Sequence, residues 1–171
     1  MTDPFLFQCP FVMMTDVGEL SLDRQERDLL RQYLDKGGFL WVDDFWGESS
    51  WAAFEQEIAA VLPTAQFPIR DLSPEHPIFR TLYEVPTLPQ IPSINSWRGM
   101  GGGTSELGAD SAEPHIRAIT DRQGRIMVLM THNTDISDAW EREAADPRYF
   151  LEFSPRGYAV GMNVVLYAMS H

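Results

Sequence analysis

Two patterns of apolar residues alternate along the chain, namely short continuous runs and longer segments with helical spacing. The runs at 10–15 and 39–43 are typical of strands that are buried on both faces. Between them, segment 21–38 predicts a helix with Ser21 as its N-cap and Gly37 as the left-handed residue after its end. The apolar residues on one face of this helix are Leu22, Leu29, Leu30, Tyr33 and Leu34.

A second helix is predicted over residues 48–63. Either Ser49 or Ser50 is the expected N-cap, and Pro63 stops the helix. Its residues at helical spacing are Trp51, Phe54, Ile58, Val61 and Leu62.

A shorter third strand is predicted over residues 66–72, at an edge of the sheet, because Pro68 cannot donate a hydrogen bond to a neighbouring strand. The next region, 73–113, is rich in proline and glycine, and we expect an irregular insertion with one helical turn at 76–84. Its glycine-rich part, 98–113, is expected to be a mobile loop.

The last third of the chain predicts a hairpin and a helix. Residues 115–120 and 125–131 are strand-like and are separated by a turn. Residues 154–169 predict a largely buried helix with Ser154 as N-cap and Pro155 at the first helical position. These elements predict a single α/β domain over residues 1–171, with a mostly parallel central sheet.

Charge and cysteine content exclude several classes of protein. The chain has 13 basic and 25 acidic residues, a formal net charge of −12, which disfavours nucleic acids and anionic membrane surfaces. The single cysteine, Cys9, excludes an internal disulfide and a cysteine-based zinc cluster. The start of the chain lacks the basic region of a signal peptide, and its longest helical apolar stretch is too short to cross a bilayer. We therefore expect a soluble chain without membrane insertion, cytoplasmic by default.

Ligands in open α/β sheets bind at the carboxyl ends of the strands. Three polar groups follow predicted strands, and we expect them to meet there. They are Thr15, Asp16, Gly18 and Glu19 after the first strand, Asp43, Asp44, Phe45 and Trp46 after the second, and Thr131, His132, Asn133, Asp135, Asp138, Trp140 and Glu141 after the last.

His132 has three interpretations. It could act as a general base oriented by Asp43 or Asp44, or it could be a metal ligand beside these carboxylates and Asp135. It could equally be a histidine whose hydrogen bonds are satisfied by loop backbone. Side chains alternate along a strand, so only one of Asp43 and Asp44 is expected to point toward the site.

Two other motifs are weaker. The segment 133–138 resembles a calcium loop but lacks its glycine and distal glutamate, so we expect Asn133 and Asp135 to cap and make turns. The loop 98–113 lacks the features of a phosphate-binding or dinucleotide-binding loop. His76 is expected to be a surface or capping residue.

Three tryptophans lie close to the predicted site. Trp46 and Trp140 are candidates for lining a sugar-binding cleft. Trp51 lies on the apolar face of the second helix, and packing is the expected role there.

The stretches "YLDKGGFLWVDDFWG", "SPEHPIFRTLYEVP", "THNTDISDAWE" and "GMNVVLYAMSH" resemble the bacterial family known as domain of unknown function 4159. That family is similar to the class I glutamine amidotransferase-like and trehalose-utilisation-like domains. The resemblance implies a flavodoxin-like three-layer sandwich and no established activity. It also implies that the chain lacks an N-terminal strand and helix of the family, leaving a sheet edge that is exposed or completed by homo-oligomerisation.

The site departs from the amidotransferases. They place a nucleophilic cysteine after a central strand and a histidine after a later one, and here "VDDFWG" has no cysteine, whereas His132 matches the histidine. Cys9 precedes the first strand and lies roughly 20 Å from its carboxyl end, so a thiol mechanism is excluded. Val17 also stands where the family usually shows a histidine.

The leading hypothesis is therefore non-covalent binding of a small polar ligand, with carbohydrate as the main class, by Asp16, Gly18, Asp43, Trp46, Asn133, Asp135, Asp138 and Trp140. The enzyme alternative is a metal-assisted or acid–base hydrolase with His132 and Asp44 as the catalytic pair. The third is a protein-interaction scaffold that uses residues 73–113. No cofactor is expected, and a divalent metal at Asp44 and His132 is not favoured.

Overall fold

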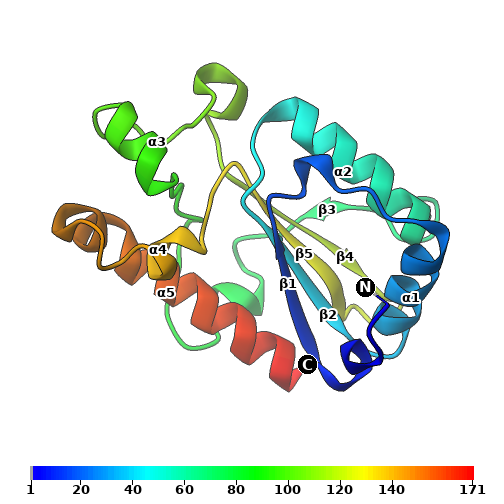
Figure 1. Cartoon of the computed structure of the whole chain (residues 1–171). Coiled ribbons are helices and arrows are strands. Elements are labelled where there is room, and N and C mark those ends of the chain that lie inside the picture. The colour runs from blue at the N-terminus through cyan, green and yellow to red at the C-terminus, as the bar shows by residue number, and fades with distance from the viewer. Residues whose placement is uncertain (1) are drawn as a thin grey trace.

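A five-stranded sheet forms the centre of the computed structural model, which describes residues 2–171 (Figure 1). Its strands are β1 (Phe11–Thr15), β2 (Phe39–Asp43), β3 (Arg70–Asp71), β4 (His115–Thr120) and β5 (Ile126–His132), in the order β1-β2-β5-β4-β3. β1, β2 and β5 are parallel, β4 is antiparallel to β5, and β3 is antiparallel to β4. Only β4 therefore runs against the other strands, which confirms the predicted mixed α/β class with a mostly parallel sheet.

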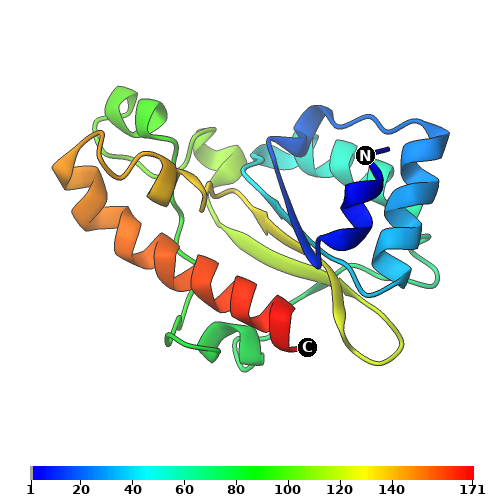
Figure 2. The same cartoon turned by 60° about the horizontal axis from the view of Figure 1, so that its bottom comes forward.

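Helices cover both faces of this sheet (Figures 1 and 2). One face packs against α1 (Arg24–Asp35) and α2 (Gly47–Val61), and the other against α5 (Pro147–Ser170). The short helices are η1 (Pro4–Gln8), η2 (Val17–Glu19), η3 (Pro77–Arg80), α3 (Ile94–Gly99), η4 (Gly108–Ser111) and α4 (Asp138–Glu141). Among residues 2–171, no helix combines the length and apolarity that crossing a bilayer requires.

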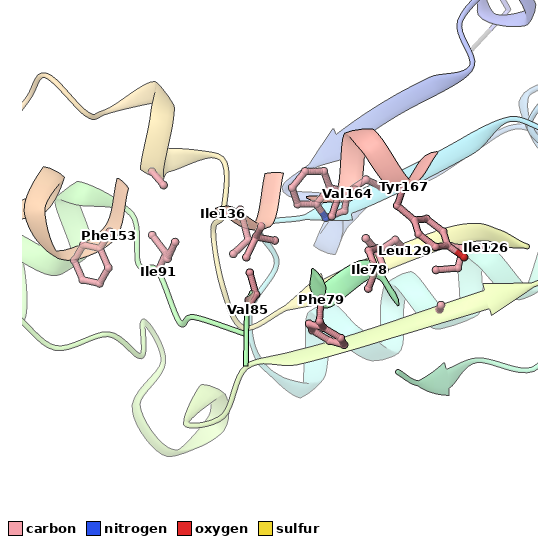
Figure 3. Close-up of a cluster of buried hydrophobic side chains, with 14 of the residues drawn as sticks. Ile78, Phe79, Val85, Ile91, Ile126, Leu129, Ile136, Phe153, Val164 and Tyr167 are labelled. Atoms are coloured by element: carbon pink, nitrogen blue, oxygen red, sulfur yellow. The ribbon is translucent and has the colours of Figure 1, made fainter. Parts of the chain in front are cut away.

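Each face of the sheet has its own hydrophobic core. Along β5, Leu129 packs on the α5 side, whereas Val128 and Met130 pack toward α1 and α2, as strand alternation requires. Figure 3 shows part of the α5-side core, where Ile78 and Phe79 of η3 meet Val164 and Tyr167 of α5 over the sheet. Full burial of one such side chain stabilises the fold by roughly 1.5–3 kcal/mol.

Of the predictions for the two edge strands, the one for β3 is correct and the one for β1 is wrong. β3 lies at an edge, as Pro68 predicted. β1 was expected to be buried on both faces, but its residues 11–14 are only half-buried because β1 forms the opposite edge. β2, in the interior of the sheet, is buried at every position.

The predicted helix starts are shifted. α1 begins at Arg24, and its N-cap is Asp23, which forms a capping box with Glu26, rather than Ser21. Gly37 has the predicted left-handed backbone, with φ 104°. α2 begins at Gly47, without a side-chain cap from Ser49 or Ser50.

α5 differs most from its prediction. It begins at Pro147 with Asp146 as N-cap, so Ser154 and Pro155 lie inside the helix. The Ser154 hydroxyl donates to the carbonyl oxygen of Ala139. The helix was also predicted to be largely buried, but several of its large apolar side chains are exposed. They are Phe150, Leu151, Tyr158, Met162, Leu166 and Met169.

Region 73–113 contains more structure than predicted. η3 gives the expected helical turn, and His76 caps it by accepting a hydrogen bond from the Ile78 amide at Nδ1 (3.3 Å). α3 was not predicted. The glycine-rich segment folds back on itself, since the hydroxyls of Ser105 and Ser111 lie 2.8 Å apart.

Candidate functional site

Three strands that point the same way each end in a residue with a left-handed backbone. Asp16 (φ 55°), Asp44 (φ 55°) and Asn133 (φ 61°) directly follow β1, β2 and β5, and they are the non-glycine residues with positive φ among residues 2–171. Asp and Asn tolerate this conformation better than other side chains. Such strain costs about 1–3 kcal/mol per residue and is concentrated at functional sites.

Backbone hydrogen bonds join these three turns at the carboxyl end of the sheet (Figure 1). The Asp16 amide donates to the carbonyl of Asp44 (2.9 Å), and the Asp44 amide donates to the carbonyl of Thr134 (3.2 Å). The Asn133 amide donates to the carbonyl of Phe45 (2.9 Å). Segments distant in sequence therefore form one rigid frame.

Asp43 is fully buried on the α5 side of this frame. The Thr131 hydroxyl donates to its Oδ1 (2.6 Å), and the Ser137 amide donates to its Oδ2 (2.9 Å). Trp41 Nε1 donates to the same hydroxyl of Thr131 (2.9 Å). Burial raises the pKa of Asp43 to about 7, against the lowering effect of its hydrogen-bond donors. Asp43 thus holds the loop after β5 in place and is not presented to solvent.

Asp44 points elsewhere, into a group of acids. Its Oδ1 accepts a hydrogen bond from Trp46 Nε1 (3.0 Å). Partial burial raises the pKa of Asp44 to about 6, and the charges of Glu106, Asp16 and Asp138 raise it further, while Trp46 opposes the shift. We call Asp16, Asp44, Glu106 and Asp138 the acidic rim.

Asp135 lies beneath the acidic rim and is buried. Its Oδ1 accepts hydrogen bonds from the Ser137 hydroxyl (2.8 Å) and the Asp138 amide (2.9 Å), so it makes the turn before α4. Burial, followed by the charges of Asp44, Asp43 and Asp138, raises the pKa of Asp135 to about 8. The structure thus gives Asp135 the turn-making role that the sequence predicted.

His132 lies on the other face of β5, toward α2. Its ring packs against Phe45 (4.8 Å between centroids), Trp51 (5.3 Å) and His115 (5.9 Å). Nε2 lies 3.1 Å from the carbonyl oxygen of Gly47, and Nδ1 lies 3.5 Å from an Arg117 guanidinium nitrogen. A carbonyl only accepts and a guanidinium only donates, which assigns the proton of the neutral ring to Nε2.

Burial is also the main reason why the pKa of His132 falls to about 4, with Arg117 lowering it further and the Gly47 carbonyl opposing the fall. The ring is therefore neutral near pH 7. Within the part of the chain that the structure describes, no hydrogen bond joins it to Asp44. The predicted catalytic pair is thus not brought together, because Phe45 packs on the ring and Asp44 turns toward the acidic rim.

The other residues predicted to bind a ligand make structural contacts, either hydrogen bonds between elements or side-chain packing. The Asn133 side chain accepts from the Gly47 amide (2.9 Å) and donates to the Glu113 carbonyl (2.9 Å), which ties β5 to α2. Gly18 allows the turn after β1 to pack closely against α2, because a Cβ there would lie 2.7 Å from the Ser50 hydroxyl. Trp46 is buried and orients Asp44.

Two tryptophans lie away from the acidic rim. Trp140 packs against Trp41 (6.1 Å) and Tyr158 (6.2 Å) on the α5 side. Trp51 stacks on Phe45 (6.1 Å) and lies under the Arg117 guanidinium (4.1 Å), the packing role predicted for it.

Glu106 is the member of the acidic rim that the sequence did not identify. It comes from the glycine-rich segment, and its Oε1 accepts a hydrogen bond from the Ser93 amide (2.7 Å) just before α3. Nothing local marks this residue, because it reaches the site only through the fold of the insertion. Across residues 2–171, no group of three or more His, Cys, Asp or Glu side chains is arranged to hold a metal ion.

The fold and the site define an α/β domain with a cluster of carboxyl groups at the carboxyl end of its sheet. The family model "Domain of unknown function (DUF4159)" matches residues 1–169, and the chain belongs to this family. No curated protein matches the chain.

Proposed function

We propose that the chain binds a small, hydroxyl-rich polar molecule, of which a carbohydrate is the main class, at the acidic rim. The observation that carries the proposal is the placement of Asp44. It is half-buried, it adopts a strained left-handed backbone between β2 and α2, and the charges of three further acids act on it.

The protonation of Asp44 favours an uncharged ligand. With its pKa raised to about 6, a fraction of this carboxyl group is protonated near neutral pH, so it can accept hydrogen bonds from hydroxyl groups and also donate to them. At this site, anionic ligands would be repelled by the acidic rim. Within residues 2–171, no side chains are arranged as metal ligands that would compensate the charge, and the proposed binding uses no cofactor.

We also propose that the fold is flavodoxin-like and related to the class I glutamine amidotransferase-like domains. The support is topological: parallel β1, β2 and β5 with helices on both faces, and a sharp turn from β2 into α2. Enzymes with such a turn present their nucleophile there in a strained conformation. Asp44 takes that place in this chain.

This placement favours one second candidate, an acid–base hydrolase. Its pair would be Asp44 and Asp135, since their environments raise the two pKa values to different extents. His132 is not part of this pair, because both of its ring nitrogens already have partners.

Thermal-shift titration with a panel of monosaccharides, disaccharides, polyols and divalent cations tests binding. The proposal predicts that at least one sugar or polyol raises the melting temperature in a saturable way. The same ligand should fail to stabilise Asp44→Asn, whose left-handed backbone asparagine tolerates. Asp28→Asn, which removes an exposed acid from α1, is the matched control. Absence of stabilisation by every sugar and polyol would contradict the proposal.

The hydrolase candidate has a separate test. If a ligand is found, its glycosidic or ester derivatives should be cleaved by the wild type and not by Asp135→Asn. Binding without cleavage of any derivative would support the binding function alone.

A further inference from the structure

A pocket lies between the end of α3 and the start of α5, and no residue of the acidic rim lines it. It has a volume of about 220 Å³ and is lined by Trp97, Arg98, Gly101, Gly102 and Arg148. This is below the roughly 300 Å³ from which pockets for drug-sized ligands start. The pocket therefore suits a small ligand.

Two guanidinium groups meet at this pocket in an otherwise acidic protein. An Arg98 guanidinium nitrogen lies 3.7 Å from the Asp146 carboxylate, and one of Arg148 lies 3.6 Å from the same oxygen. One carboxylate thus faces two cations, and Arg98 Nη2 also donates to the Ala145 carbonyl (2.9 Å). Arg148 is also largely exposed, so its remaining donors are free to turn toward a ligand.

The indole N–H of Trp97 provides independent support for a ligand, because it lacks a hydrogen-bond acceptor. Trp97 is buried, with 6% of its surface exposed, and Nε1 is the buried side-chain nitrogen or oxygen of residues 2–171 that lacks a hydrogen-bond partner. Leaving a buried donor unsatisfied is costly, and most such groups have partners. Gly102 of the pocket lining lies beside this buried nitrogen, because a Cβ placed on Gly102 would be 3.8 Å from it.

Two glycines form one wall of the pocket. Gly101 (φ 67°) and Gly102 (φ 100°) take left-handed conformations without a side chain, which keeps the wall of the pocket thin. α5, a helix of 24 residues, begins at Pro147 beside Arg148, so its positive dipole end adds to the field of the two arginines.

From these observations we infer that this pocket binds the phosphate group of a small phosphate ester. Arg98 and Arg148 would pair with its oxygens, as arginine does with phosphate in general, and Trp97 Nε1 would donate to a third oxygen. The site is separate from the acidic rim and does not depend on the function proposed there.

The test follows the indole N–H signal of Trp97 by ¹H–¹⁵N NMR, assigned by its absence in Trp97→Phe. Inorganic phosphate, glycerol 3-phosphate and acetate are titrated at constant ionic strength. The inference predicts a saturable shift of this signal with both phosphates and little change with acetate. Tighter binding of glycerol 3-phosphate than of inorganic phosphate is expected, and equal or weaker binding would overturn the assignment to an ester.

Arg98→Gln and Arg148→Gln should each weaken the binding of glycerol 3-phosphate about tenfold. Arg156→Gln, which removes an exposed charge farther along α5, is the matched control and should bind as the wild type does. Absence of a saturable shift, or an equal loss of affinity in the control, would overturn the inference. The Arg148 variant keeps the test valid if Trp97→Phe fails to fold, because Arg148 is 81% exposed.

Discussion

The Nε2 atom of His132 lies 3.1 Å from the carbonyl oxygen of Gly47, and this contact joins the last residue of β5 to the first residue of α2. The Asn133 side chain repeats the connection by accepting from the Gly47 amide. A histidine held in this way, neutral and among aromatic rings, fixes the position of α2. The turn between β2 and α2, which contains Asp44, is thereby held in place.

Replacing His132 by alanine should therefore destabilise the fold by about 2–4 kcal/mol, because it removes a buried ring and leaves the Gly47 carbonyl without a donor. Chemical denaturation measures this loss. His115→Ala is the control and should cost less, since His115 is only half-buried. An unchanged stability of His132→Ala together with a loss of ligand binding would instead indicate a direct role in the site.

The same histidine makes stability depend on pH. Its pKa is about 4 in the folded state and about 6.5 in the unfolded state. Between these values the unfolded chain binds the proton and the folded chain does not, so stability is lost as the pH falls from about 6.5 to 4. The free energy of unfolding of the wild type minus that of His132→Gln should fall over this window. A difference that is constant with pH would contradict the neutral, buried state of the ring.

The buried acids predict the opposite slope. The pKa of Asp135 is about 8 in the folded state and about 3.9 in the unfolded state, so between these values the folded chain holds a proton that the unfolded chain has lost. Stability therefore falls as the pH rises from about 4 to 8. Asp135→Asn keeps the acceptor for Ser137 and Asp138 and removes this penalty. It should be several kcal/mol more stable than the wild type at pH 8 and much closer to it at pH 5.

Denaturation of both proteins at the two pH values measures this effect. Asp28→Asn should show the pH dependence of the wild type, because Asp28 is exposed on α1. The account of Asp135 fails if Asp135→Asn retains the full pH slope.

A side chain at Gly47 should destabilise the fold. The φ of 78° at this position is strained for other residues, and a Cβ would lie 2.4 Å from an Asp110 carboxylate oxygen and 2.8 Å from Leu107. Gly124 has a similar φ of 84° but open space around it. Gly124→Ala should thus cost about 1 kcal/mol from backbone strain alone. Gly47→Ala should cost more than this, because the ends of the exposed Asp110 and Leu107 side chains must also move.

Thermal or chemical denaturation of the two glycine variants separates strain from packing. Equal losses would show that the segment 107–110 yields easily, and the close contact between it and α2 would then not hold the site together.

Local signals in the sequence identified the sheet well, but not the start of α5. The runs that became β2 and β5 are short, continuous and apolar, as is typical of strands buried on both faces. At α5 two similar signals compete, Asp146 before Pro147 and Ser154 before Pro155, and either is a good helix start. The earlier one was used because Tyr149 and Phe153 could then be buried in the core. Such a choice depends on tertiary packing, which the sequence pattern does not show.

For the candidate site, the sequence predicted where the acids gather but not the orientation of each side chain. That acids would gather at the carboxyl end of the sheet followed from the order of strands and polar groups. Which face each side chain takes depends on register, and strand alternation placed Thr131 beside Asp43 but turned His132 toward α2. Glu106 reaches the acidic rim from an insertion whose path no periodic pattern describes.

The central claim is that Asp44 binds an uncharged, hydroxyl-rich ligand at the acidic rim. Isothermal titration calorimetry with the most stabilising sugar or polyol of the thermal-shift panel tests it most directly, using the wild type, Asp44→Asn and Asp28→Asn. The account predicts saturable binding to the wild type and to Asp28→Asn, and at least about tenfold weaker binding to Asp44→Asn. Equal affinity of all three proteins would contradict it.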